Sequence, residues 1–202
     1  MPLVAAGALA WLALYANEER LARGGDPGDL SGVRAYDRVA VPLAWKYGQR
    51  LANVALTASL ALTVAGAAWL APGPELLTLA EAVVLTGVVT EVVKVLASRP
   101  YPYMVRRRLE GSTQGWENGA NYASFFSGHT AIPMAATLAS GVLLDRAGVA
   151  LGPRLLLLGA GSLLALLGGS LQVSAGNHYP SDVVAGALCG AALGAFAVLA
   201  HD

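Results

Sequence analysis

The sequence predicts an all-α fold, a polytopic membrane bundle of about six transmembrane helices. Hydrophobic residues make up 55% of the chain and charged residues 13%, whereas soluble domains carry about 25% charged residues. Mean hydropathy is +0.55, and apolar runs recur along all 202 residues. We therefore expect one membrane-embedded domain over residues 1–202, surrounded by membrane lipids. The formal net charge of zero gives no electrostatic basis for a nucleic-acid partner, and we expect none.

Spanning the hydrocarbon core takes about 20 apolar residues. Five stretches meet this length, at 51–71, 75–97, 123–144, 154–173 and 180–200. A sixth, 2–16, is short and stops at the polar run 17–20, and we expect it to span as well. Ala71-Pro72-Gly73-Pro74 predicts a tight turn, so we expect the second and third spans to pair as an antiparallel hairpin.

Two long connections join these spans. Residues 17–49 predict a turn and then an interfacial helix with the aromatic anchors Trp45 and Tyr47. Residues 98–122 predict a loop on the side of the active site, and a loop of this length in a compact bundle is usually functional or disordered.

Glycines recur at every fourth residue of the last span, at Gly186, Gly190 and Gly194. Small residues at this spacing let helix backbones approach closely. We expect them to pack within the bundle rather than to form a dimer interface. The oligomeric state is left open.

The polar residues of the spans gather on one side of the bundle. Six spans place residues 17–49, 98–122 and 174–179 on the same side of the membrane. Lys94, the segment 127–129 and the segment 178–182 lie at or just inside that side. The sequence therefore predicts one polar site at one membrane face.

Two of the three histidines, His129 and His178, start predicted helices on this side. Ionisable residues at membrane depth are costly and usually mark function. Asp182 follows His178 by four residues, so one helical turn can bring the carboxylate to the ring and fix its tautomer. This pair alone is equally consistent with a simple helix start.

Ser127-Gly128-His129 places a hydroxyl and a backbone amide at a predicted helix N-terminus, which is a natural anion site. Lys94 reaches either into the same pocket or, paired with Glu91, out to the membrane interface. On these residues alone, the second interpretation of Lys94 is favoured.

Together these segments resemble the type 2 phosphatidic acid phosphatase superfamily, which also includes vanadium haloperoxidases and glucose-6-phosphatase-like enzymes. The motifs of that family read Lys-x6-Arg-Pro, Pro-Ser-Gly-His and Ser-Arg-x5-His-x3-Asp. Lys94 opens the first, 127–129 forms most of the second, and His178 with Asp182 closes the third. The resemblance covers about residues 50 to 200.

The resemblance implies a role for each residue. His178 would attack phosphorus to form a phosphohistidine, Asp182 would orient it, and His129 would protonate the leaving oxygen. Lys94, Ser127 and Gly128 would hold the phosphoryl oxygens of a lipid-phosphate substrate. Neither a metal nor another cofactor is implied.

The chain departs from the family at both arginines that clamp the phosphate. Tyr101 and Gln172 stand at these positions, and Phe126 replaces the proline of the second motif. We expect Arg99, displaced by two residues, to supply the missing charge, with Gln172 and Tyr101 as neutral donors. Arg106, Arg107 and Arg108 are the other candidates for the clamp.

The leading hypothesis is a membrane phosphatase or phosphotransferase acting on a lipid phosphate. The loss of both arginines favours a second hypothesis, a non-catalytic relative that binds a lipid phosphate or a membrane partner. A transporter or channel is the third, and the sequence shows no internal repeat to support it.

We expect an integral protein of a bacterial inner membrane. Eleven of its 13 Lys and Arg residues lie on the motif side, which favours a cytoplasmic site. Bacterial relatives usually act at the outer face, so the orientation is left undecided.

Overall fold

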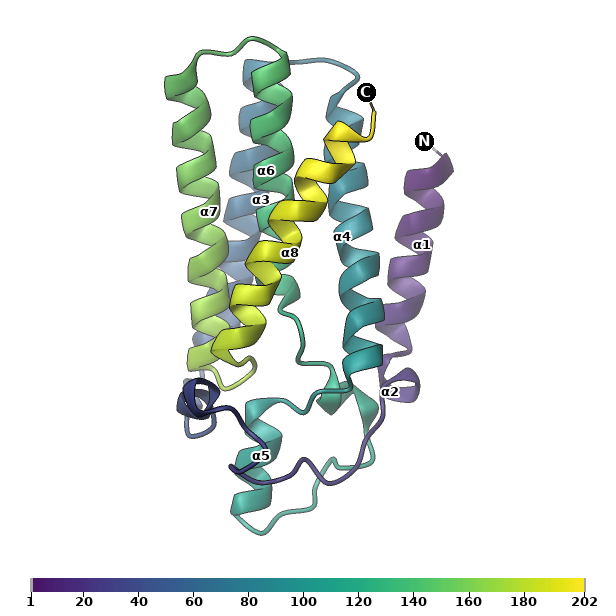
Figure 1. Ribbon diagram of the computed structural model, residues 1–202, viewed down its shortest axis with the longest axis vertical. Coiled ribbons are helices and arrows are strands. Elements are labelled where there is room, and N and C mark those ends of the chain that lie inside the picture. Colours follow the sequence, from purple (N-terminus) through teal and green to yellow (C-terminus); the bar gives the residue numbers. More distant parts are fainter. Residues whose placement is uncertain (1, 202) are drawn as a thin grey trace.

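The computed structural model describes residues 2–201 and confirms the all-α prediction. Six long helices form a bundle, in which the last one crosses the others obliquely (Figure 1). They are α1 (Pro2–Ala16), α3 (Gly48–Leu70), α4 (Leu76–Ala97), α6 (Gly128–Arg146), α7 (Leu151–Ser174) and α8 (Pro180–Leu199). Four short elements join them, namely α2 (Glu18–Leu21), α5 (Pro102–Leu109) and the 3-10 helices η1 (Ala35–Ala40) and η2 (Gly119–Tyr122).

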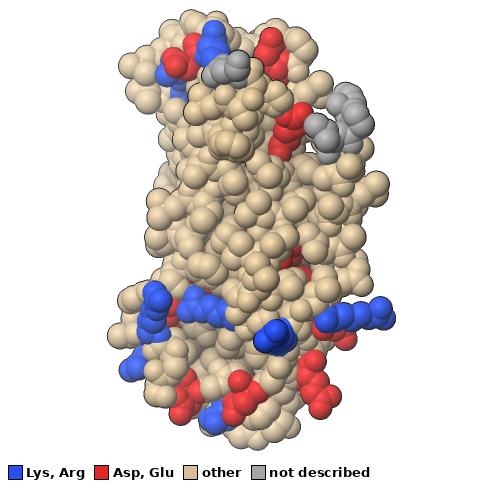
Figure 2. All heavy atoms as spheres, turned by 45° about the vertical axis from the view of Figure 1, so that its right-hand side comes forward, with Lys and Arg blue, Asp and Glu red and all other residues tan. Residues whose placement is uncertain are grey.

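The connections predicted to share one side do lie together. Residues 17–47, 98–127 and 175–179 meet at the lower end of Figure 1, and the turns 71–75 and 147–150 lie at the upper end. Charged side chains gather toward the two ends of the molecule, with a largely uncharged band between them (Figure 2). This distribution matches a bundle whose middle contacts hydrocarbon.

Four helices are long and apolar enough to cross a membrane: α3, α4 taken together with α5 (Leu76–Leu109), α7 and α8. The stretch expected at 123–144 is not among them, and its crossing stays a prediction. Its helix, α6, starts later, at Gly128, and packs against α3, α4, α7 and α8. A helix enclosed by protein can carry polar residues such as Thr130, Thr137 and Ser140, all of them buried. The apolar part of α1, Val4–Ala16, is short, and its crossing stays a prediction.

The glycine series of α8 packs within the bundle, as predicted, and its partner is α6. A Cβ atom on Gly186 would lie 2.6 Å from the Ser127 carbonyl oxygen, and Cβ atoms on Gly190 and Gly194 would collide with the backbone of Ala131 and Ala135. This close approach of the two helices holds the start of α8 beside the start of α6.

The prediction that the second and third spans pair as a hairpin was wrong. A short turn joins α3 to α4, but α3 packs mainly against α7 and α6, whereas α4 packs against α6, α8 and α1. A short connection limits the distance between helix ends, and α6 fits between the two helices.

The two long connections also differ from their predictions. Residues 17–49 contain the short helices α2 and η1 rather than an interfacial α-helix, and Asp37 within η1 is fully buried. Residues 98–122 contain α5 and η2 rather than an irregular loop. Pro102 starts α5, because a proline ring suits the first turn of a helix.

Candidate active site

A cavity of about 390 Å³ opens at the motif end of the bundle. It brings together His129 and His178, which the sequence placed in one polar site. Lys94, Tyr101, Gly128 and Gln172 also lie in its wall, and the remaining lining residues are Tyr15, Glu18, Gln49, Tyr103, Ala120, Asn121 and Asn177. Six of the nine residues predicted for the site thus share one cavity.

The pairing of His178 with Asp182 has the predicted geometry. Asp182 Oδ2 lies 3.4 Å from His178 Nδ1, and the carboxylate also accepts hydrogen bonds from the Tyr179 backbone amide at 2.9 Å and the Ser124 hydroxyl at 2.5 Å. Asp182 is therefore held in one orientation at the first turn of α8, which leaves His178 Nε2 as the nitrogen for other contacts.

His129 is held by side chains of α3. Asn53 Oδ1 lies 2.8 Å from His129 Nε2 and also accepts a hydrogen bond from Gln49 Nε2 at 3.0 Å. Because this oxygen accepts both contacts, His129 Nε2 is the protonated nitrogen in this arrangement. Asn177 extends the chain of amides, since its Nδ2 donates to Gln49 and, at 2.9 Å, to Gln172 Oε1.

Lys94 lies in the cavity wall and is also paired with acids. Its Nζ donates to Glu18 Oε1 and to Glu91 Oε1, both at 3.0 Å. Lys94 thus both lies in the pocket and pairs with Glu91, the two arrangements that the sequence offered as alternatives. Glu18, from α2, adds a second carboxylate that the motifs did not reveal.

Gln172 and Tyr101 occupy the cavity wall at the two positions where the family has arginine. Gln172 is 1% exposed, and within the described residues its Nε2 has no hydrogen-bond partner. Tyr101 packs edge-on to the His178 ring, and its hydroxyl donates to the Ala123 carbonyl oxygen at 3.0 Å. Gln172 therefore keeps a free donor, whereas the predicted donor role of Tyr101 needs correction, because its hydroxyl proton is engaged.

Arg99 does not reach the cavity, which corrects the expected clamp. Its guanidinium donates to Asp182 Oδ1 at 2.5 Å, to Ser181 Oγ at 2.8 Å and to Asp37 Oδ2 at 2.8 Å. The same group lies 3.9 Å from the centre of the Tyr179 ring, and burial raises the pKa of that phenol, which stays neutral. Arg99 thus contacts Asp182 behind the histidine and lines a separate hollow with Arg34 and Phe125.

Ser127 is the other predicted ligand that lies outside the cavity wall. Its side chain is fully buried at the start of α6, where its hydroxyl accepts a hydrogen bond from Thr130. Gly128 lies in the cavity wall. The anion site expected at 127–129 therefore lacks the Ser127 hydroxyl and consists of the backbone amides in the first turn of α6.

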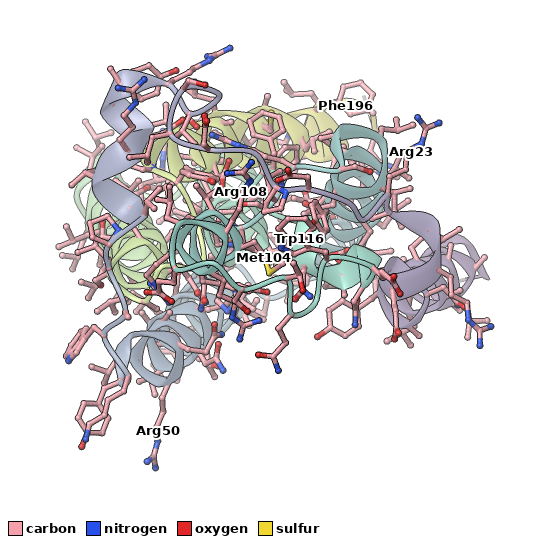
Figure 3. The ribbon with its side chains drawn as sticks, turned by 90° about the horizontal axis from the view of Figure 1, so that it is seen from below. Arg23, Arg50, Met104, Arg108, Trp116 and Phe196 are labelled. Carbon is pink, nitrogen blue, oxygen red and sulfur yellow. The ribbon has the colours of Figure 1, made fainter. Side chains whose placement is uncertain are left out.

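The three arginines of α5 are each engaged with the protein. Arg106 donates to the Leu43 carbonyl oxygen, Arg107 lies 5.4 Å from the centre of the Tyr103 ring, and Arg108 pairs with Asp26 at 2.6 Å. Seen from the motif end, Arg23 and Arg50 point outward from the bundle (Figure 3). Within residues 2–201, Lys94 is therefore the one lysine or arginine in the cavity wall.

Several residues of the site were missed by the motif comparison. Gln49 and Asn53 lie four residues apart at the polar end of an otherwise apolar span, a spacing that could have indicated them. Asp37 and Glu18 carried no comparable signal, because they lie in an irregular segment. The described residues form no group of three or more His, Cys, Asp or Glu side chains suited to a metal ion.

Comparison with known proteins identifies the family of the chain. No curated protein and no solved structure matches the chain. The PAP2 superfamily matches residues 75–202, a segment that contains Lys94, His129, His178 and Asp182. Since this match covers more than half of the sequence, the chain belongs to the PAP2 superfamily.

Proposed function

We propose that the protein is a membrane phosphatase or phosphotransferase that acts on a lipid phosphate ester through a phosphohistidine on His178. Members of the PAP2 superfamily are phosphatases, and four helices of the chain are apolar and long enough to cross a membrane. The observation that carries the proposal is the shared cavity of His129 and His178, with Asp182 behind the second ring.

The reaction follows from this arrangement in two displacements. His178 forms a bond to phosphorus while the bond from phosphorus to the lipid oxygen breaks, and His129 in its doubly protonated form gives that oxygen a proton and becomes neutral. Water then displaces His178 and returns a proton to His129. The Lys94 ammonium and the Gln172 amide would bind the phosphoryl oxygens as charge shifts onto them.

Alcohol release tests this proposal. Purified protein in detergent micelles is given a lipid phosphate ester, and the freed alcohol is measured. We expect turnover by the parent and at least about a 1000-fold loss in His178→Ala, because no other group replaces the nucleophile. His201→Ala is the matched control, since His201 lies in the turn after α8 and pairs with Glu81. Equal turnover by His178→Ala would reject the mechanism.

The charges of the cavity favour a second candidate, a relative that binds a lipid phosphate without turning it over. Gln172 and Tyr101 are neutral, and Lys94 lies between two carboxylates. Lipid binding without alcohol release by the parent would support this candidate. We further expect the protein in a bacterial inner membrane, which fractionation of the source cells would test.

A further inference from the structure

The charges around the cavity indicate which phosphate ester it accepts. Lys94 in its wall is offset by Glu18 in the same wall and by Glu91 behind it, each 3.0 Å from the ammonium. Both carboxylates repel an anion. A ligand with two negative charges would therefore enter a buried site without a matching positive charge.

Arg99 and Arg108 do not change this balance. Arg99 already contacts Asp37 and Asp182, and Arg108 contacts Asp26. Moving Arg99 into the cavity would leave two fully buried carboxylates without their cation.

Gln172 supplies a hydrogen-bond donor without a charge. Its side chain is 1% exposed and lies in the cavity wall, its Oε1 accepts from Asn177, and its Nε2 has no partner among residues 2–201. A buried amide donor without a partner is unfavourable until a ligand oxygen accepts from it. The ammonium and the neutral amide can each donate to one phosphoryl oxygen, and the two carboxylates repel a ligand with one negative charge less than a ligand with two.

We propose that this cavity selects lipid phosphodiesters, which carry one negative charge, over lipid phosphomonoesters, which carry between one and two at neutral pH. The inference rests on the proposed function and names its substrate class. With a diester, the two displacements break one of the two ester bonds. Diester and water then give a phosphomonoester and an alcohol, and no inorganic phosphate.

A pair of lipids that differ mainly in charge at phosphorus tests the selectivity. A diacylglycerol phosphate and its methyl diester, with the same acyl chains, are titrated into His178→Ala protein in neutral detergent, so that binding is measured without turnover. We expect the diester to bind about tenfold more tightly, the effect of roughly one uncompensated charge in a partly screened site. Equal or tighter binding of the monoester, or binding of neither lipid, overturns the proposal.

Two variants test which residues set this preference. Gln172→Arg adds a charge to the wall and should tighten monoester binding at least about tenfold, with the exposed Gln114→Arg as control. Glu18→Gln removes a repelling charge and should act in the same direction, with the exposed Glu19→Gln as control. Glu18→Gln also serves if Gln172→Arg does not fold. If Gln172→Arg or Glu18→Gln folds and still binds the monoester no more tightly than before, the preference is not set by these residues and the proposal is overturned.

Turnover by the parent separates the two proposals. Selective binding of the diester without alcohol release from either lipid contradicts phosphoryl transfer and leaves the selectivity standing. Faster turnover of the monoester than of the diester contradicts the selectivity and leaves phosphoryl transfer standing.

Discussion

At the scale of single residues, the site differs from a simple phosphate clamp in the position of Arg99. Its guanidinium bridges Asp37 and Asp182, at 2.8 Å and 2.5 Å. Asp182 in turn lies 3.4 Å from His178 Nδ1. Arg99 is therefore a positioning residue, because it acts on the nucleophile through Asp182.

Arg99→Lys tests this role. Lysine keeps the charge but cannot donate to both carboxylates with a rigid fork. We expect kcat to fall about tenfold while KM stays within about twofold, because Arg99 lies outside the cavity wall. Steady-state kinetics on Arg99→Lys, with Arg34→Lys as control, measure both constants. A tenfold rise in KM at unchanged kcat would instead mean that Arg99 binds the substrate.

The sequence could predict the residues whose chemistry is local. His178 and Asp182 lie one helical turn apart, so their pairing follows from spacing alone. The engagement of Arg99 could not be predicted in the same way, because its partner Asp37 lies 62 positions earlier in a segment without regular periodicity. Glu18 likewise reaches Lys94 across 76 positions.

At the scale of helices, the site depends on how closely α8 packs against α6. His129 starts one of these helices and His178 precedes the other. Glycines on α8 leave room for the backbone of α6, so the two histidine-bearing ends lie side by side. Glycine spacing predicted that α8 packs within the bundle but not that α6 is its partner, and the neighbours of α3 and α4 depended on the position of α6 and were missed.

Gly190→Ala tests the packing. A Cβ atom there would lie 2.8 Å from the Ala131 Cα atom, so the helices must move apart. We expect a loss of about 1–3 kcal/mol in the free energy of unfolding, with reduced turnover. Gly159→Ala on α7 is the control, because its Cβ atom would meet no atom within 4 Å, and it should be neutral or stabilising. Equal melting temperatures for the two variants in detergent would contradict the close packing.

At the scale of the whole molecule, one end of the bundle carries the chemistry. The cavity wall takes residues from five of the six long helices and from the connections that meet at this end, as Tyr15 of α1, Gln49 of α3 and Gln172 of α7 illustrate. Hydropathy predicted the four helices that are long and apolar enough to cross a membrane. It did not reveal that α6 packs against four other helices, α3, α4, α7 and α8.

Trapping phosphorus on His178 tests the proposed chemistry most directly. Purified parent protein is quenched in alkali during turnover of a lipid ester labelled at phosphorus, and the label is located by peptide mass spectrometry. We expect alkali-stable, acid-labile label on His178, none on His178→Ala, and undiminished label on His201→Ala. Turnover by the parent with label absent from His178, or with label on another residue, would contradict the phosphohistidine mechanism.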